Sequence, residues 1–199
     1  MFSNIKDQWY SLAVSVLLGI SVIGNLAQHR VIRSLSVAGA AAQEIQGVGT
    51  RVPALSVRDL SGKPTLIEYQ QQKTPTLLYA FSPSCSWCKR NTAALHDLSR
   101  LIGSRYRLVG LALSSAGLEG YLAEHPIDFP VYTGVPASAI DAYRLRSTPE
   151  TIVISADGVV LRVWTGAFEG PNKEDIERYF SVRLPTVIAA TEIGQLLKK

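Results

Sequence analysis

Cys85 and Cys88 are the residues of this sequence with the clearest chemistry. They are its only cysteines, they are separated by two residues, and they lie between the apolar run 76–81 and a helical pattern. The free N–H groups and the dipole at the start of a helix favour negative charge on Cys85, and a thiolate is the form that attacks a disulfide. Cys88, one helical turn further on, could then displace the partner from the mixed disulfide. The spacing therefore predicts a dithiol that opens and closes during a redox reaction.

Two structural roles compete with this interpretation. A permanent disulfide between these cysteines would close a very short loop, so it would stabilise the fold by only about 2 kcal/mol. A zinc site would need further donors, but the histidines His29, His96 and His125 are scattered and show no second paired spacing. Redox chemistry is therefore the better explanation of the pair.

Composition narrows the class of protein. The chain has 199 residues, of which 47% are hydrophobic, and this is enough for one medium-sized domain with accessory segments. Its formal charge of +4 is scattered, without a basic run or interleaved aromatic residues, so we expect no nucleic-acid partner. Two cysteines are also too few for a small secreted domain that depends on several disulfides.

An uncharged, mostly apolar segment lies near the N-terminus. Residues 8–29 contain no Lys, Arg, Asp or Glu, and a helix of about 20 apolar residues can cross a bilayer. Trp9 and Tyr10 at its start suit a membrane interface. A signal peptide cleaved near residues 38–42 is the alternative. We expect a short segment at 1–8, a retained transmembrane anchor at 9–28 and a stalk or linker at 29–48.

The remaining sequence alternates strand-like and helix-like segments over residues 49–185, followed by a tail at 186–199. A strand, a helical crossover and a second strand around the cysteines predict two parallel strands, and the turn at 156–158 predicts an antiparallel hairpin. This order indicates an α/β domain with a mixed sheet. We expect strands at 51–57, 64–67, 76–82, 106–113, 150–155 and 159–165, and helices at 86–102, 118–124, 137–143 and 173–180, the last with Asn172 as its N-cap.

Three motifs in this order resemble the thioredoxin fold. They are Asp59–Lys63 in an introductory hairpin, Phe81–Lys89 around the cysteines, and Thr148–Gly158 at the start of the later hairpin. More narrowly, residues 49–185 look like the membrane-anchored TlpA/ResA-type redoxins, which are related to the cytochrome c maturation and MauD-type thioredoxins. The resemblance implies a central mixed sheet flanked by helices, with an N-terminal β-hairpin extension and one preceding transmembrane helix.

The resemblance also implies a substrate-binding surface beside the cysteines. Pro149 should be the cis-proline that faces the dithiol, where a cis bond would expose the backbone of Thr148 to an extended peptide; an ordinary trans proline at a strand start is the alternative. Trp87 would help to dock the substrate, or it would cover the core. Lys89 and Arg90 are cations that could lower the pKa of Cys85, although their helical positions favour contact with water.

The sequence departs from the family at two positions. Thioredoxins commonly place Trp before the first cysteine, where this chain has Ser84. The buried acid that thioredoxins carry six residues before that cysteine corresponds to Tyr79 here. Glu150, next to Pro149, is therefore our candidate acid–base group, with a solvent-facing strand residue as the alternative.

The predicted function is that of a membrane-anchored thiol-disulfide oxidoreductase acting on protein disulfides or dithiols. Cys85 would exchange with the substrate and Cys88 would resolve the mixed disulfide. No metal or organic cofactor is expected, because the two sulfurs carry the electrons. Other predicted partners are membrane lipid, through the N-terminal helix, and a membrane-bound electron donor. The redox domain would face the periplasm or another extracytoplasmic side, although Lys6 before the anchor and Arg30 and Arg33 after it slightly oppose that orientation.

Two other activities use related folds. A peroxiredoxin-like peroxidase usually has a proline seven residues before its cysteine, but Leu78 occupies that position. A copper-binding thioredoxin-fold chaperone would use two thiolates and a histidine, and nothing in the sequence brings His125 to Cys85. Both remain alternatives to the oxidoreductase.

Overall fold

The computed structural model describes residues 21, 47–70 and 72–184. Apart from residue 21, the predicted anchor at 9–28 and the tail at 186–199 lie outside the described residues. The chain divides into two units, Met1–Gln46 and Gly47–Lys199, and the fold described here belongs to the second. Within the described part of the chain, no helix has the length and apolar character required to span a bilayer.

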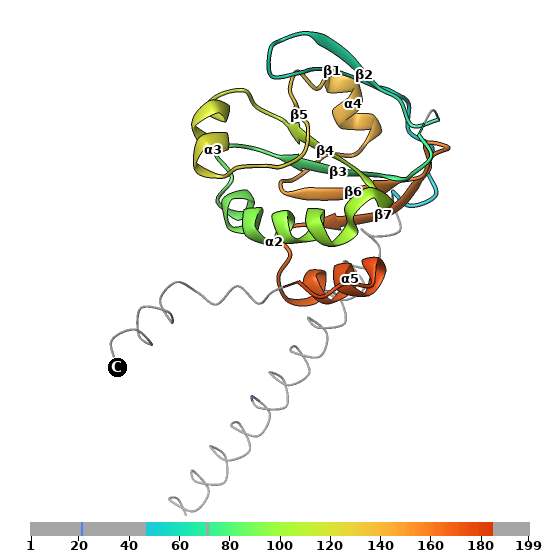
Figure 1. Cartoon of the computed structure of the whole chain (residues 1–199), viewed down its shortest axis with the longest axis vertical. Coiled ribbons are helices and arrows are strands. Elements are labelled where there is room, and N and C mark those ends of the chain that lie inside the picture. The colour runs from blue at the N-terminus through green and yellow to red at the C-terminus, as the bar shows by residue number, and fades with distance from the viewer. Residues whose placement is uncertain (1–20, 22–46, 71, 185–199) are drawn as a thin grey trace, which may run out of the picture. The chain divides into compact units, whose positions relative to one another are not determined.

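The central strand of the domain is β3 (Thr76–Phe81), in a five-stranded sheet with the order β5-β4-β3-β6-β7 (Figure 1). Every residue of β3 is buried, which explains why this segment is almost continuously apolar. On one side β4 (Arg107–Ala112) pairs with it in parallel, and on the other β6 (Glu150–Ile154) pairs with it antiparallel. The sheet is therefore mixed, as the sequence predicts.

The helix that follows the cysteines, α2 (Ser86–Ile102), has the bounds predicted from the sequence. Gly103 ends it with φ +50°, a positive φ that glycine adopts readily. A short 3₁₀ turn, η1 (Gly103–Arg105), then leads into β4. The inward residues of α2 recur with helical spacing: Cys88, Asn91, Ala94, Leu95, Leu98 and Ile102.

The other elements complete the sheet and its covering layers. Strand β5 (Val131–Tyr132) pairs parallel with β4, and β7 (Val160–Thr165) pairs antiparallel with β6. The introductory hairpin forms a separate two-stranded sheet of β1 (Leu55–Arg58) and β2 (Pro64–Ile67). The remaining helices are α3 (Leu118–Glu124), α4 (Ala137–Ala142) and α5 (Gly170–Phe180).

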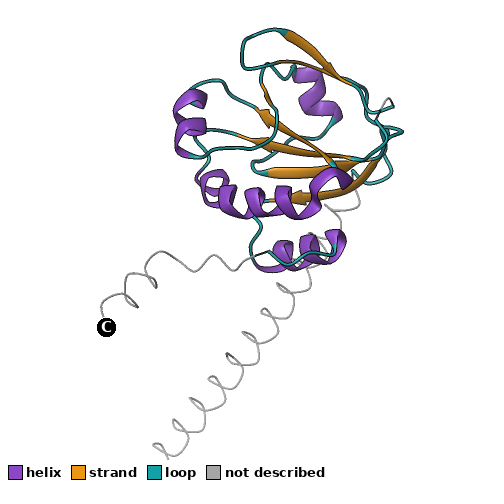
Figure 2. Ribbon diagram, viewed as in Figure 1, coloured by secondary structure: helices purple, strands orange, loops and turns teal. Residues whose placement is uncertain are grey.

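Alternation along β3 divides the core between the two faces of the sheet, and Figure 2 shows helices on both sides of the strands. Leu77, Tyr79 and Phe81 pack with residues of α2, α3 and α5. Leu78 and Ala80 pack with the β1–β2 hairpin and α4 on the opposite face. The dithiol therefore belongs to the face that α2 covers.

Helix α5 begins earlier than predicted, and the predicted cap is wrong. Glu169 occupies the N-cap position, and Pro171 lies in the first turn, where a missing N–H costs little. Asn172 is already inside the helix, and its side-chain amide donates to the carbonyl groups of Thr165, at 2.7 Å, and Ala167, at 3.4 Å. It therefore joins α5 to the loop after β7 instead of capping the helix.

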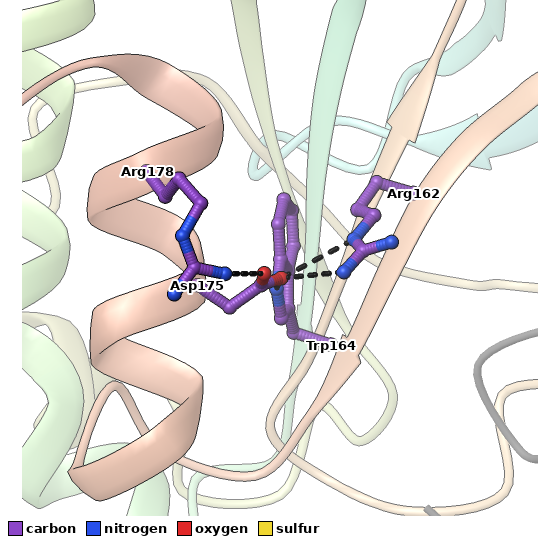
Figure 3. A network of polar contacts seen from close by, with 4 residues as sticks. All are labelled: Arg162, Trp164, Asp175 and Arg178. Carbon is purple, nitrogen blue, oxygen red and sulfur yellow. Dashed lines mark hydrogen bonds and ion pairs between the residues drawn. The ribbon is translucent and has the colours of Figure 1, made fainter. Parts of the chain in front are cut away.

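A partly buried carboxylate, that of Asp175, provides a second connection between α5 and β7 (Figure 3). Asp175 Oδ2 accepts hydrogen bonds from Arg162 and from the indole Nε1 of Trp164, both at 2.7 Å. Its other oxygen accepts from Arg178 at 3.2 Å. This network fixes α5 against β7, an edge strand of the five-stranded sheet.

Candidate active site

Cys85 occupies the N-cap of α2, where the chain turns from β3 into the helix. The turn is closed by a hydrogen bond from the Cys85 N–H to the Ser82 carbonyl at 3.0 Å. Its sulfur accepts the backbone N–H of Cys88 at 3.2 Å, which places it against the positive end of the helix. Cys85 is partly exposed and Cys88 is fully buried, and both are free thiols.

The two thiols have pKa values shifted in opposite directions. For Cys85, burial opposes ionisation, but hydrogen bonds from the side chains of Cys88 and Thr148 and from the helix backbone outweigh it and lower the pKa. For Cys88, burial is the largest cause of the shift and the hydrogen bond with Cys85 is the second; together they raise the pKa to about 12. The partly exposed Cys85 sulfur therefore ionises more readily than that of Cys88, and burial favours the protonated form of Cys88.

The loop before β6 places Thr148 and Pro149 beside Cys85. The Thr148–Pro149 peptide bond is cis, as predicted. The Cys85 thiol donates to the Thr148 carbonyl at 3.3 Å. Residues separated by 63 positions in the sequence thus meet at the end of the central strand.

Glu150 lies directly after the cis-proline, at the start of β6, and its side chain is buried. Burial raises the pKa of its carboxyl group to about 7, although hydrogen bonds from the backbone of Arg146 and Ser147 partly offset this effect. Glu150 pairs with Ala80, so its side chain lies on the sheet face opposite to α2. The carboxyl group therefore contacts the backbone before the cis-proline from the sheet face opposite to α2.

Trp87 forms an exposed aromatic surface next to the cysteines, with 49% of its area accessible. The guanidinium group of Arg90 lies over its ring, 4.4 Å from the centroid. Glu169 holds that guanidinium with both carboxylate oxygens, at 3.0 and 3.1 Å. Arg90 is thus engaged with Trp87 and Glu169, and its charge is not among the main influences on Cys85.

Buried polar groups lie beneath the dithiol, and sequence reasoning identified only one of their positions, Tyr79. The Tyr79 hydroxyl accepts from the Asn91 amide at 3.3 Å, and Asn91 Oδ1 accepts from the Phe168 N–H at 2.7 Å. Asn91 follows Cys88 by three residues, on the inward face of α2. A polar residue at a core position of this helix was the signal that could have identified it.

Among the described residues, metal-ligand clusters and cavities are the other features that could form a centre. Within the described ranges, no three His, Cys, Asp or Glu side chains gather as metal ligands. A cavity of about 520 Å³ is lined by residues that include Arg51, Glu68 and Asp157. It lies beside the turn that follows β6, and the end of β6 pairs with the start of β3, whereas Cys85 follows the end of β3. The cavity and the dithiol are therefore at opposite ends of the sheet.

Comparison with known proteins agrees with this geometry. No protein-family model matches the chain. A thioredoxin-like protein of Haemophilus influenzae is 27% identical over 122 residues, which cover 60% of this chain and 71% of that protein. The thiol-disulfide oxidoreductase ResA of Halalkalibacterium halodurans is 22% identical over 191 residues, covering 90% of this chain and 97% of ResA.

Solved structures show the same fold. A Chlorobium tepidum protein described as a DsbE-type thiol:disulfide interchange protein superposes with a TM-score of 0.57 at 15% identity, covering 67% of this chain and 94% of that one. Among these proteins, the relative named thiol-disulfide oxidoreductase ResA supports the activity predicted from the sequence. The predicted α/β fold is confirmed, and so is the resemblance of this chain to the thioredoxin-like, ResA-type redoxins.

Proposed function

We propose that this protein is a membrane-anchored thiol-disulfide oxidoreductase that acts on protein disulfides or dithiols. The observation that carries the proposal is the asymmetry of the two thiols. Cys85 is accessible with a lowered pKa, and Cys88 is buried with a raised pKa at the next turn of the same helix. Such a pair attacks through its outer sulfur and resolves through its inner one.

Variants of each cysteine test the two roles separately. Cys85→Ser should abolish reduction of a protein disulfide such as insulin, because it removes the attacking thiolate. Cys88→Ser should still attack but remain bound to its partner, so mixed disulfides should accumulate on non-reducing gels. Circular dichroism of both variants serves as the control for folding. Normal turnover by Cys88→Ser would show that the resolving role is wrong.

The same trap identifies partners. Each turnover that reduces a substrate leaves a Cys85–Cys88 disulfide, so a second dithiol must restore the reduced pair. We propose a membrane-bound electron donor for this step, supported by the apolar segment at 9–28. Mass spectrometry of adducts trapped by Cys88→Ser in membranes should recover an integral membrane thiol protein. Recovery of soluble partners alone would contradict a membrane donor.

We propose substrate docking for Thr148, which contacts the Cys85 sulfur, for its neighbour Pro149 and for Trp87 in the first turn of α2. Thr148 would pair its backbone with an extended segment of the substrate, and Trp87 would cover an adjacent apolar side chain. Trp87→Ala should lower kcat/KM for a protein disulfide by about three- to tenfold, with little effect on a small aromatic disulfide. Leu101→Ala is the matched control, because Leu101 is 45% exposed on the same helix but far from Cys85. Equal losses on both substrates would contradict a docking role.

A further inference from the structure

Trp87 is fixed beside the nucleophile through its backbone, but its side chain is exposed. Its N–H is among the groups that donate to the Cys85 sulfur at the start of α2, and 49% of the residue's surface is accessible. An exposed indole samples several rotamers, and a substrate that binds it must then bear the entropic cost of ordering it. A docking surface made of Trp87 alone would be weak unless other groups hold the ring.

Arg90 is the first of those groups. It follows Trp87 by three residues in α2, so the two side chains lie on one face of the helix. The guanidinium group is stacked over the indole, with Cζ 4.4 Å from the ring centroid, within the range of a cation–π interaction. One face of the ring is thus covered by a cation. Arg90 is itself exposed, so its position depends on a further contact.

Glu169 supplies that contact from the loop between β7 and α5. Its two carboxylate oxygens accept from Arg90 Nη2 at 3.0 and 3.1 Å. The backbone beside Glu169 is held in place, because the Phe168 N–H donates to the buried Asn91 side chain at 2.7 Å. A series of contacts therefore runs from this loop through Glu169 and Arg90 to the Trp87 ring.

The Arg90–Glu169 ion pair is poorly placed to stabilise the fold. Of the two side chains, 58% and 48% of the surface is accessible, and exposed pairs gain little because two long side chains must be ordered. The buried bond between Asn91 and Phe168 already joins α2 to the same loop. The main consequence of the ion pair is therefore local: it fixes the guanidinium group and, through it, the ring of Trp87.

The charges around Trp87 determine which substrate side chain it can take. Arg90 occupies one electron-rich face of the ring, where a cation is attracted. A basic side chain brought to the same ring would be repelled by that guanidinium, and Lys89, which is exposed in the same helical turn, adds positive charge. An apolar side chain would instead gain from burial against the indole. The site therefore favours a substrate disulfide with an apolar neighbour over one with a basic neighbour.

We propose that Arg90 and Glu169 are positioning residues that hold Trp87 for docking, and that the ring selects substrate disulfides flanked by an apolar rather than a basic side chain; this inference rests on the proposed function. Glu169 orders the guanidinium group, and the guanidinium group orders the ring and repels a second cation. The effect is on docking, because the charge of Arg90 is not among the main influences on Cys85.

Two peptide probes measure this selectivity. Each has one cysteine in a disulfide with 2-nitro-5-thiobenzoate, and the residue after that cysteine is leucine in one probe and lysine in the other. When the reduced full chain is mixed with a probe, the Cys85 thiolate attacks the peptide sulfur and the coloured thiolate leaves. Cys88 then attacks Cys85, the internal disulfide forms, and the peptide leaves as a thiolate. The coloured release should be about fivefold faster with the leucine probe.

Variants of the two positioning residues should alter docking and leave the reactivity of the thiolate unchanged. Glu169→Ala should slow the release from the leucine probe about threefold, without changing the rate at which iodoacetamide, a small uncharged reagent, alkylates Cys85. Arg90→Ala should slow the leucine probe similarly and bring the rates of the two probes closer together, because the cation is gone. In a Trp87→Ala chain, Glu169→Ala should add no further loss, since the ring it positions is absent.

Asp128→Ala is the matched control. Asp128 is another exposed carboxylate that holds a side chain of α2, but it accepts from Ser99, at 2.8 Å, near the other end of that helix. This variant should match the unchanged chain with both probes and with iodoacetamide. Circular dichroism checks the fold of each variant, and Arg90→Ala decides if Glu169→Ala does not fold.

Three results would overturn the inference. They are equal rates of the two probes in the unchanged chain, slowing by Glu169→Ala that persists in the Trp87→Ala chain, and equal slowing of the iodoacetamide reaction. Failure of the proposed function has a different signature: the coloured thiolate would be released, but the peptide would stay bound and no Cys85–Cys88 disulfide would form.

Discussion

Glu150 is a residue whose burial has a measurable effect on the whole domain. Its carboxyl group sits behind the cis-proline loop and has a pKa of about 7, compared with an ordinary value of 4.5. If a carboxyl group holds its proton more tightly in the folded than in the unfolded state, the folded state loses stability at pH values where the unfolded chain is already ionised. The carboxylate is thus tolerated at this position at the expense of stability, which is common near functional sites.

This argument predicts the pH dependence of stability. The free energy of unfolding should fall as pH rises from about 4.5 to about 7, by about 2 to 3 kcal/mol, and should then level off with respect to this group. Glu150→Gln keeps an acceptor for the backbone of Arg146 and Ser147 but cannot ionise, so it should not show that fall. Urea unfolding of both proteins between pH 4 and 8 measures the difference. Glu119→Gln, an exposed change on α3, is the control.

The result also bears on catalysis. If Glu150 acts as an acid–base group through the cis-proline loop, the activity of the unchanged protein should vary around pH 7 and that of Glu150→Gln should not. Identical pH profiles of stability and activity in the two proteins would show that the carboxyl group does not ionise near neutrality.

Among the elements, α2 could be predicted from sequence because its signals are local. An apolar stripe with helical spacing, a polar start and a terminal glycine are all contained within 86–103. The start of α5 was misplaced because Asn172 is a good cap in general, whereas its amide is occupied by the loop after β7. Pro171, a residue favoured in a first helical turn, was the local signal for the correct start.

The surroundings of the dithiol could be predicted only in part, because several of their contacts join residues far apart in the sequence. The cysteines and Pro149 belong to motifs that can be read along the chain. The Arg90–Glu169 ion pair joins residues 79 positions apart, and the Asn91–Phe168 bond joins residues 77 positions apart. The sequence around each residue does not identify its distant partner, so only the folded arrangement of α2 against the β7–α5 loop shows these two pairs.

The attachment of α5 to β7 gives a prediction for this element. Burial opposes ionisation of Asp175, but its bonds to Arg162 and Trp164 outweigh that effect and lower its pKa. Its stabilising contribution should therefore be present above about pH 4 and should decline as pH falls through the lowered pKa. Asp175→Asn should reduce the free energy of unfolding by about 1 to 2 kcal/mol at pH 7, and the deficit should shrink towards pH 2.

Urea unfolding at the two pH values measures that deficit. Asp141→Asn is the matched control, because Asp141 forms an exposed ion pair with Arg146 at 3.5 Å, and exposed pairs contribute little. A constant deficit for Asp175→Asn at all pH values would mean that shape, and not charge, accounts for the effect of this residue.

At the scale of the whole molecule, the redox unit and the N-terminal segment pose separate physical questions. The residues proposed to reduce a protein disulfide, which are the dithiol and the cis-proline loop, lie in the unit from Gly47 onward. Exchange with a membrane-bound donor additionally needs confinement to a bilayer. We propose that residues 9–28 provide this confinement and that the redox unit faces the extracytoplasmic side, where disulfide exchange with exported proteins takes place.

Accessibility of Cys85 tests that orientation, because this cysteine is partly exposed whereas Cys88 is buried. A maleimide that cannot cross membranes should label the reduced protein in intact bacterial spheroplasts, and labelling after lysis should add little. The chain with both cysteines changed to serine controls for reaction elsewhere, and a cytoplasmic thiol protein controls for leakage. Labelling only after lysis would place the dithiol in the cytoplasm, as the charges Lys6, Arg30 and Arg33 slightly favour. Recovery of the chain in the soluble fraction would instead contradict a retained anchor.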